Sequence, residues 1–532
     1  MNPIVVKELR QAVKSRFVVT VLMLLLAILM VILTAVLLNQ DARRGLDEDA
    51  GAELFLVFQS ILLATCMLFV PVYVGVRLAA ERSTATSDLI YVTTIRPSSI
   101  VWGKLLAGMV VTALTFSACA PFMVITYLLR GIDLPTILFV LGLDALIVLA
   151  ATQLAIFVGT MPIGWPVKAI LGLVLIGISV MGFSGMTVFI GQELLRSGIG
   201  SAMDDREFWI AMATFVGSWL AAVMMVFFLS VSMIAPATAN RAVVPRLYFT
   251  LMWAGSFLGF FALAMNVGSV EPMLAWLIVM FILLMFAALI SASEREVLGP
   301  RLRRVIPRSR LLRIPAFFFY SGAGGGLLWV QGLLILTLLG TFLALTYFHG
   351  LSHSGSAWSG RSFSGYDPFP DFWLQRFAAS GMWVIGYLLL SVIICRRVMR
   401  MKNGTIITGV MGLIIMAAVS VIPMMIAYGM DPDRWDFNVE FWLMLNPFGP
   451  VFCDDGDWRG TYGFYALILS TGFFATMQIV NLPWYFRQMR GFGPPQGVTP
   501  INTSSQESFG KAMQVAEISP NPSAPAVELN DG

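Results

Sequence analysis

The sequence predicts an all-helical, polytopic membrane protein with about twelve transmembrane helices. Two observations support this prediction. Of the 532 residues, 58% are hydrophobic and only 12% are charged, so polar side chains are too few to cover the surface of a water-soluble protein of this size. The apolar residues are also gathered into long runs between short polar segments, and about 20 such residues are enough for a helix to cross the hydrocarbon core.

Twelve runs have this length, and each is expected to form one spanning helix. Prolines inside them are tolerated where neighbouring helices satisfy the backbone groups that a proline leaves unpaired. A very tight turn is expected at Val270, Glu271 and Pro272, between the seventh and eighth runs. In chain order the runs lie near 17–38, 54–76, 104–128, 137–161, 169–190, 209–235, 248–267, 273–293, 326–347, 374–396, 405–428 and 460–486.

Residues 1–16 precede the first run and are expected to form an interfacial helix. A helix with one apolar and one basic face lies in the plane of the membrane surface. It serves either as a basic flank of the first spanning helix or as a docking element for a cytoplasmic protein. The apolar face would carry Val5, Val6, Leu9, Ala12 and Val13, and the basic face Lys7, Arg10, Lys14 and Arg16.

Residues 79–104 form a polar segment between the second and third runs, where we expect a short helix on the membrane face. Thr86 or Ser87 can cap its start, and Asp88 stands in the first turn, where the helix dipole favours a negative charge. Pro97 would end it. The charged side chains expected to face water or a partner protein are Glu81, Arg82, Asp88, Arg96 and Lys104.

The basic residues predict the orientation. With the N-terminus on the cytoplasmic side, 25 of the 34 lysines and arginines fall on that side and nine on the other, as the positive-inside rule requires. Both termini and the 79–104 segment are then cytoplasmic. The arginine-rich segment 295–313 is either an anchor held by anionic lipid or a second contact to a cytoplasmic partner.

Two stretches of sequence resemble the ABC-2 type transporter permeases. Glu81-Arg82, Thr86, Asp88-Leu89-Ile90 and Gly103-Lys104-Leu105-Leu106 are similar to the family's segment after its second membrane helix, with Ala85 where the family usually has glycine. Asn2-Pro3 and Lys7-Glu8-Leu9-Arg10 are similar to the family's N-terminus.

The resemblance implies a permease of the cell (inner) membrane that exports its substrate and works with a separate cytoplasmic ABC ATPase subunit holding ATP and Mg. The residues expected to couple the two subunits fall into two groups. The first group, which positions the 79–104 segment and contacts the ATPase, is Glu81, Arg82, Thr86, Asp88 and Arg96. The second contact is Lys7, Glu8 and Arg10.

A weak internal repeat suggests two six-helix halves, residues 17–247 and 248–486, followed by a mostly disordered cytoplasmic tail at 487–532. Glu294-Arg295 follows the eighth run as Glu81-Arg82 follows the second. One chain can then supply both halves of a translocation pathway. Alternatively, the second half is a divergent addition and a second copy of the chain completes the working unit.

Asp144 is the carboxylate that lies well inside a predicted span. Ionisable groups at such depth are functional candidates by default, so Asp144 has either a role in a transport pathway or a structural role as a protonated or internally paired group. Four glutamines within the spans are expected to form hydrogen bonds between helices. They are Gln59, Gln153, Gln331 and Gln478.

Several kinds of chemistry are not indicated by the sequence. There is no G-x-x-x-x-G-K-[ST] phosphate loop, so this chain is not expected to hydrolyse ATP or to be an enzyme. His349 and His353, the two histidines, and the four scattered cysteines do not predict a metal site. The net charge of +4 gives no indication of nucleic acid binding. Two alternatives remain open: an ion-coupled carrier that uses Asp144, and a non-transporting membrane scaffold.

Overall fold

The structure, a computed structural model, describes most of the chain as long helices. No β-strand occurs among the described residues. Those residues are 3–39, 50–83, 96–129, 132–161, 164–196, 205–236, 239–294, 298–307, 309–353, 371–399, 406–430, 444–452 and 461–493.

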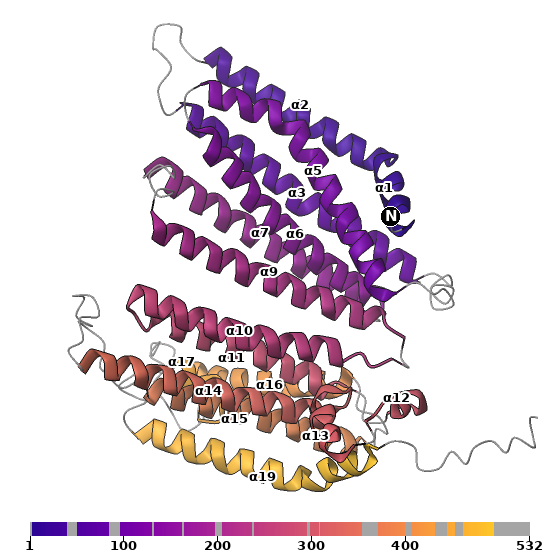
Figure 1. The fold of residues 1–532 in the computed structure, drawn as a ribbon, viewed down its shortest axis with the longest axis vertical. Coiled ribbons are helices and arrows are strands. Elements are labelled where there is room, and N and C mark those ends of the chain that lie inside the picture. The colour runs from indigo at the N-terminus through magenta and orange to yellow at the C-terminus, as the bar shows by residue number, and fades with distance from the viewer. Residues whose placement is uncertain are drawn as a thin grey trace, which may run out of the picture.

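Six long helices and one short amphipathic helix make up the first half of the described chain, and Figure 1 shows their arrangement. The amphipathic helix is α1 (Pro3–Val13), which ends just before α2 begins. The long helices are α2 (Arg16–Asn39), α3 (Ala50–Ser83), α5 (Pro97–Leu128), α6 (Leu134–Thr160), α7 (Trp165–Arg196) and α9 (Arg206–Ile234).

The second half again contains six long helices. They are α10 (Val243–Val267), α11 (Glu271–Ala292), α14 (Ala323–His353), α15 (Asp371–Ile393), α16 (Ile406–Met430) and α19 (Thr461–Gly491). Three short helices, α12 (Pro300–Arg304), α13 (Arg310–Phe319) and α17 (Gly449–Phe452), lie in the connections, and the π-helix η1 (Ile394–Val398) continues α15.

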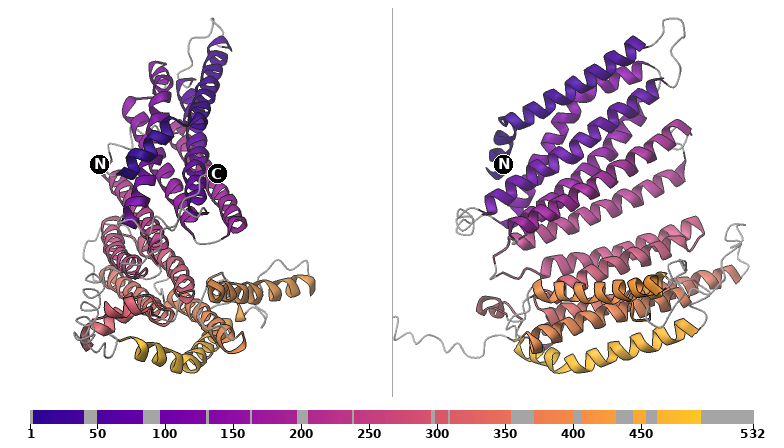
Figure 2. Two further views of the ribbon diagram at one scale, coloured as in Figure 1. Left: turned by 90° about the vertical axis from the view of Figure 1, so that its right-hand side faces the viewer. Right: turned by 180° about the vertical axis from the view of Figure 1, so that it is seen from behind.

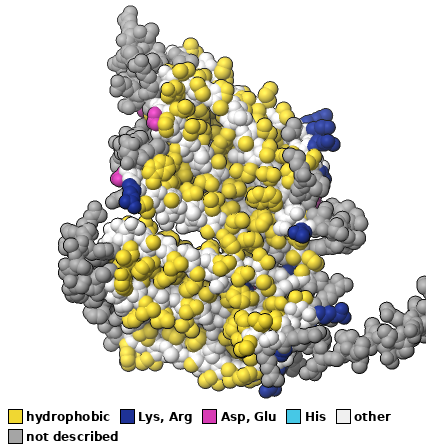
Figure 3. Space-filling model, in the orientation of Figure 1, with side chains coloured by type: hydrophobic (Ala, Val, Ile, Leu, Met, Phe, Trp, Pro, Cys, Tyr) yellow, Lys and Arg dark blue, Asp and Glu magenta, His cyan; other side chains and the backbone are white. Residues whose placement is uncertain are grey.

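Eleven of the described helices are long and apolar enough to cross a membrane. In α16, which occupies the place of the predicted span 405–428, the apolar part Ile407–Pro423 is shorter than such a span. Figure 3 shows hydrophobic side chains covering the middle of one face, with lysine and arginine mostly at one edge. The chain is therefore an all-helical, multi-pass membrane protein, as predicted.

The long helices run roughly side by side in two groups, each around its own hydrophobic core (Figures 1 and 2). Phe55, Phe58 and Ile156 are fully buried in the core of the first group. Leu327 and Leu388 are fully buried in that of the second. The two groups meet where α9 packs against α10.

Small residues allow α3 and α6 to pack closely in the first group. A Cβ atom on Gly159 would lie 3.1 Å from the carbonyl oxygen of Gly75, and one on Gly75 would lie 3.2 Å from the Cβ of Ala155. Close backbone approach at small residues is the usual source of helix association in membranes, where no hydrophobic effect drives it.

The predicted tight turn between the seventh and eighth spans is confirmed. Gly268 ends α10 with φ of 69°, in the left-handed region that glycine enters without steric cost. The next helix begins three residues later at Glu271, with Pro272 in its first turn, where the missing amide proton costs no hydrogen bond.

The predicted separate helix over 79–104 is wrong at both of its ends. Residues 79–83 belong to α3, and Pro97 begins α5 instead of ending a helix. Counting apolar residues underestimates such helices, because a helix satisfies its own backbone in water as well as in lipid and so continues past the membrane. The rest of the segment, with Thr86, Ser87 and Asp88, lies outside the described residues.

Two other predicted boundaries also move because helices run on. The helix α19 continues to Gly491, so the first residues of the predicted tail at 487–532 are helical. Likewise α14 continues through His349 to His353, past the end of the predicted span 326–347. Residues 494–532 lie outside the described part of the chain.

Candidate functional site

A buried lysine joins three helices at one end of the first half. Lys104, in the second turn of α5, is 3% exposed. Its Nζ lies 3.0 Å from Oε1 of Glu8 on α1 and 2.8 Å from Oε2 of Glu81 near the end of α3. We call these three residues the Lys104 cluster. One cation is shared between two carboxylates, so each carboxylate is stabilised by a charge contributed by another helix.

The pattern of α1 explains why a glutamate lies in this position. Val5, Glu8 and Ala12 are all buried, and their spacing of three and four residues places them on one face of the helix. Lys7 and Arg10 are exposed. The face that packs against the bundle therefore carries a carboxylate among apolar side chains.

A second set of contacts holds α1 against α3. Arg77 of α3 donates hydrogen bonds to the Gln11 side chain of α1 and to the Tyr73 hydroxyl of its own helix. The Arg77 guanidinium also lies 5.2 Å from the centre of the Tyr73 ring. The N-terminal helix is thus bound by charged and polar contacts at two points.

These positions change the interpretation of several predicted coupling residues. Glu8 and Lys104 are buried and paired with each other, so the expectation that Lys104 faces water is wrong, and Glu81 is also paired with Lys104. Arg96 is exposed just before α5. Arg82 lies within α3, but its side chain, like Thr86 and Asp88, lies outside what is described.

A second buried cation lies at the start of the second half. Arg246 in α10 is 3% exposed. Its Nη2 lies 2.7 Å from Oε1 of Glu294, just after α11. Its Nη1 donates to the backbone oxygens of Phe318 at 2.8 Å and Tyr320 at 2.7 Å, and the Gly322 amide donates to Oε2 of Glu294 at 2.7 Å. We call this the Arg246 cluster.

The Arg246 cluster fixes the connection between α13 and α14 to the ends of α10 and α11. Burial raises the pKa of the Glu294 carboxyl, and the Arg246 guanidinium and the Gly322 amide oppose that rise by favouring its ionised form. A Cβ atom on Gly326 would overlap the Arg246 guanidinium, so glycine is needed at this position for the arginine to enter.

The two clusters involve the two glutamates of the sequence repeat. Glu81 closes the second spanning helix of the first half and Glu294 that of the second half, and each holds a buried cation. The cations differ in position, because Lys104 is on the third spanning helix of its half and Arg246 on the first of its own. Sequence similarity at the glutamates gave no indication of either cation.

Within the spans, Asp144 of α6 is fully buried against Gln59 of α3, which is fully buried as well. Gln59 Nε2 donates to both carboxylate oxygens at 3.0 Å. The predicted role of the glutamines as hydrogen-bonding groups between helices is confirmed. Gln153 donates to Ser230 at 3.0 Å, and Gln478 donates to Gln331 at 3.0 Å.

Replacing Asp144 with leucine is expected to cost about 1 to 3 kcal/mol of stability, because the Gln59 amide is then buried without its acceptor. Replacing Gln59 with leucine as well should recover most of that loss, since both polar groups are then removed. Thermal unfolding of the single and double variants in detergent measures this.

If Asp144→Asn stays folded but transport is abolished while ATP depletion has no effect, an ion-coupled carrier is indicated instead.

The described residues contain no group of three or more His, Cys, Asp or Glu side chains placed to bind one metal ion. Cys66, Cys119 and Cys395 are free thiols, and all three are buried. Comparison of the chain with known protein families, with curated proteins and with solved structures finds no match.

Proposed function

We propose that this multi-pass membrane protein is the permease subunit of an ATP-driven transporter resembling the ABC-2 type. A separate cytoplasmic ATPase subunit, which holds ATP and Mg, powers it. The chain lies in the cell membrane with both termini in the cytoplasm and exports its substrate. The observation that supports the proposal best is the Lys104 cluster, which ties the N-terminal interfacial helix to the ends of two spanning helices.

The cluster gives a physical route by which a push on α1 can move the bundle. Separating Lys104 from Glu8 leaves two buried charges unpaired, which costs about 3 to 5 kcal/mol. The pair with Glu81 contributes less, because that side chain is 34% exposed. A displacement of α1 that costs less than this moves α3 and α5 with it. The spanning helices then tilt together, as a change in access across the membrane requires.

Exposed charges on α1 provide the contact for the ATPase in this proposal. Lys7 and Arg10 face away from the bundle, and neither belongs to the Lys104 cluster. An acidic surface on the ATPase would match them. Arg96, which is exposed just before α5, offers a further basic contact in this proposal.

The test is affinity purification of the tagged chain from native membranes in mild detergent, followed by identification of bound proteins and an ATPase assay. A stoichiometric ATP-binding subunit is expected. The double variant Lys7→Glu/Arg10→Glu should lose most of it, because two contacts become repulsive. The control is Arg206→Glu, which reverses an exposed charge at the start of α9, on the predicted opposite side of the membrane, and should retain it.

Two results would contradict the proposal. One is a chain that purifies without an ATP-binding subunit under conditions that preserve known membrane complexes. The other is equal retention of the ATPase by the α1 double variant and by the α9 control. Either result would favour the carrier or the scaffold, and Asp144 would then be the next residue to test.

A further inference from the structure

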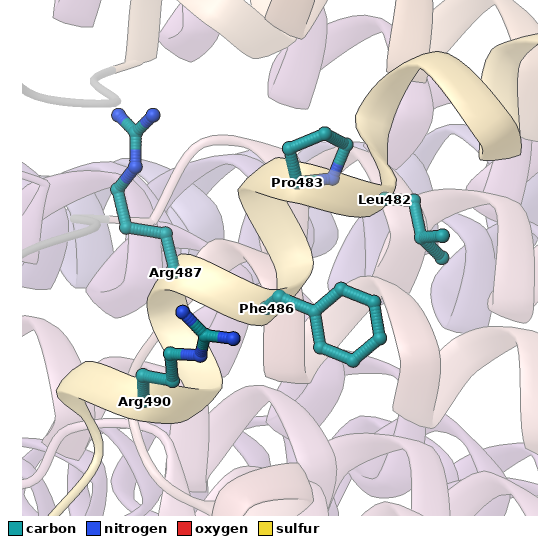
Figure 4. A pocket seen from close by; sticks show the side chains of 5 residues that line it. All are labelled: Leu482, Pro483, Phe486, Arg487 and Arg490. Atoms are coloured by element: carbon teal, nitrogen blue, oxygen red, sulfur yellow. The ribbon is translucent and has the colours of Figure 1, made fainter.

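We propose that the C-terminal end of α19 binds an anionic phospholipid. A recess of about 440 Å³ lies there and is lined by residues of this one helix (Figure 4). We call it the α19 recess. Its lining is Leu482, Pro483, Phe486, Arg487 and Arg490. In this proposal the two guanidinium groups hold the lipid phosphate, and an acyl chain lies along Leu482 and Phe486.

Contacts on the other side of α19 fix the direction in which the recess faces. Trp484, Tyr485 and Phe492 are all buried. The Gln488 side chain accepts a hydrogen bond from the Gly324 amide at 2.8 Å, and the Phe492 ring lies 5.4 Å from that of Phe317 on α13. These contacts set the rotation of the helix.

The five recess residues face away from the bundle as a consequence. Leu482 and Phe486 are 49% and 51% exposed, and both arginines are exposed. Because residues three and four apart share a helix face, Pro483, Arg487 and Arg490 align with Leu482 and Phe486. Figure 4 shows the side chains projecting from this stretch of α19.

The position of the recess along α19 places its two parts at the levels of a phospholipid's headgroup and acyl chains. The helix α19 has 31 residues, whereas about 20 cross the hydrocarbon core. Its last turns therefore reach the headgroup region. Arg487 and Arg490 lie within the last five residues, at the level of lipid phosphates, and Leu482 and Phe486 lie deeper, at the level of the acyl chains.

The charge at this end of the second half favours an anion. Arg304, Arg397 and Arg490 are exposed here. Among the described residues the carboxylate at this end is Glu294, and Arg246 neutralises it. A phosphate bound at the recess therefore meets positive charge, with no competing carboxylate in the part of this end that the structure describes. An acidic protein would match the arginines alone, but Leu482 and Phe486 lie on a spanning helix, where the lipid chains reach them.

The experiment is native mass spectrometry of the full-length chain in mild detergent. The probes are phosphatidylglycerol and phosphatidylcholine with the same acyl chains. Retention of phosphatidylglycerol should exceed that of phosphatidylcholine. Each basic residue near a charged lipid surface raises the affinity for anionic lipid roughly fivefold. The double variant Arg487→Gln/Arg490→Gln should therefore weaken phosphatidylglycerol retention by about 25-fold.

The matched control is Arg206→Gln/Arg397→Gln, which removes the same charge from exposed positions outside the recess and should change retention less than twofold. Equal loss in both double variants would overturn the proposal, because the charge would then act diffusely. Phe486→Ser keeps both arginines and should still lower retention. Displacement of the lipid by excess inorganic phosphate would also overturn it, since the arginines would then recognise phosphate alone.

Loss of the fold is measured separately in a Cys453→Ser background, where the buried thiols of Cys66, Cys119 and Cys395 react with a thiol dye only when the protein opens. If the double variant labels faster than wild type, the single variant Arg490→Gln replaces it. About fivefold weaker retention is then expected, and unchanged retention in a folded Arg490→Gln would overturn the proposal.

Discussion

Replacing Lys104 with methionine is expected to destabilise the protein by about 3 to 5 kcal/mol, the cost of removing one partner from a buried ion pair. The substitution removes the charge that Glu8 and Glu81 share. Glu8 is 6% exposed, so its carboxylate has little access to water and is left beside a second negative charge. The attachment of α1 to α3 and α5 should then weaken, because only the Arg77–Gln11 contact remains of its described polar links, and transport driven by the proposed ATPase should fall.

Thermal unfolding monitored with a thiol-reactive dye can measure this loss, because the described cysteines are buried and react when the fold opens. Cys453 lies outside the described residues and is replaced with serine in the background. The control Lys7→Met removes an exposed lysine from α1 and should leave the unfolding temperature nearly unchanged. An equal effect of the two variants would contradict the expectation.

A second variant separates charge from packing. Adding Glu8→Gln to Lys104→Met removes one of the two carboxylates left without their cation, and part of the stability should return. Recovery supports the ion pairs as the source of the loss. If the double variant is as unstable as Lys104→Met alone, the lysine acts through the packing of its aliphatic chain.

Replacing Arg246 with leucine is the other change with a large expected effect, again about 3 to 5 kcal/mol from the broken buried pair with Glu294. The carbonyl groups of Phe318 and Tyr320 also lose their donor, and hydrogen bonds to a charged group contribute about 1.5 to 3 kcal/mol each. The connection between α13 and α14 should open before the rest of the second half.

Arg246→Lys distinguishes the shape of the guanidinium from its charge. A lysine keeps the positive charge but lacks the planar fork that reaches Glu294 and two carbonyl groups at once. The stability of the Arg246→Lys variant should therefore lie between those of wild type and Arg246→Leu in the same thiol assay. Arg304→Lys on α12 is the matched control and should behave as wild type. A lysine variant as stable as wild type would show that charge alone is sufficient.

The sequence by itself determined the fold class, the approximate position of the long helices and the tight turn near residues 270–272. These features depend on properties that are local in the chain. A run of about 20 apolar residues must cross the membrane as a helix, because no other local structure satisfies the backbone in lipid. The glutamines at 59, 153, 331 and 478 were predictable as hydrogen-bonding groups, because a polar side chain inside a span needs a partner on a neighbouring helix. The identity of those partners was not predictable.

The tertiary structure alone decided which charges pair inside the protein. Glu8 and Lys104 are 96 residues apart in the chain, and Arg246 and Glu294 are 48 apart. Whether a charged residue at a helix end faces water or a neighbouring helix depends on the rotation of that helix, and packing sets the rotation. The spacing of residues along one helix therefore could not show that Lys104 is buried, nor which face of α19 carries its two exposed arginines.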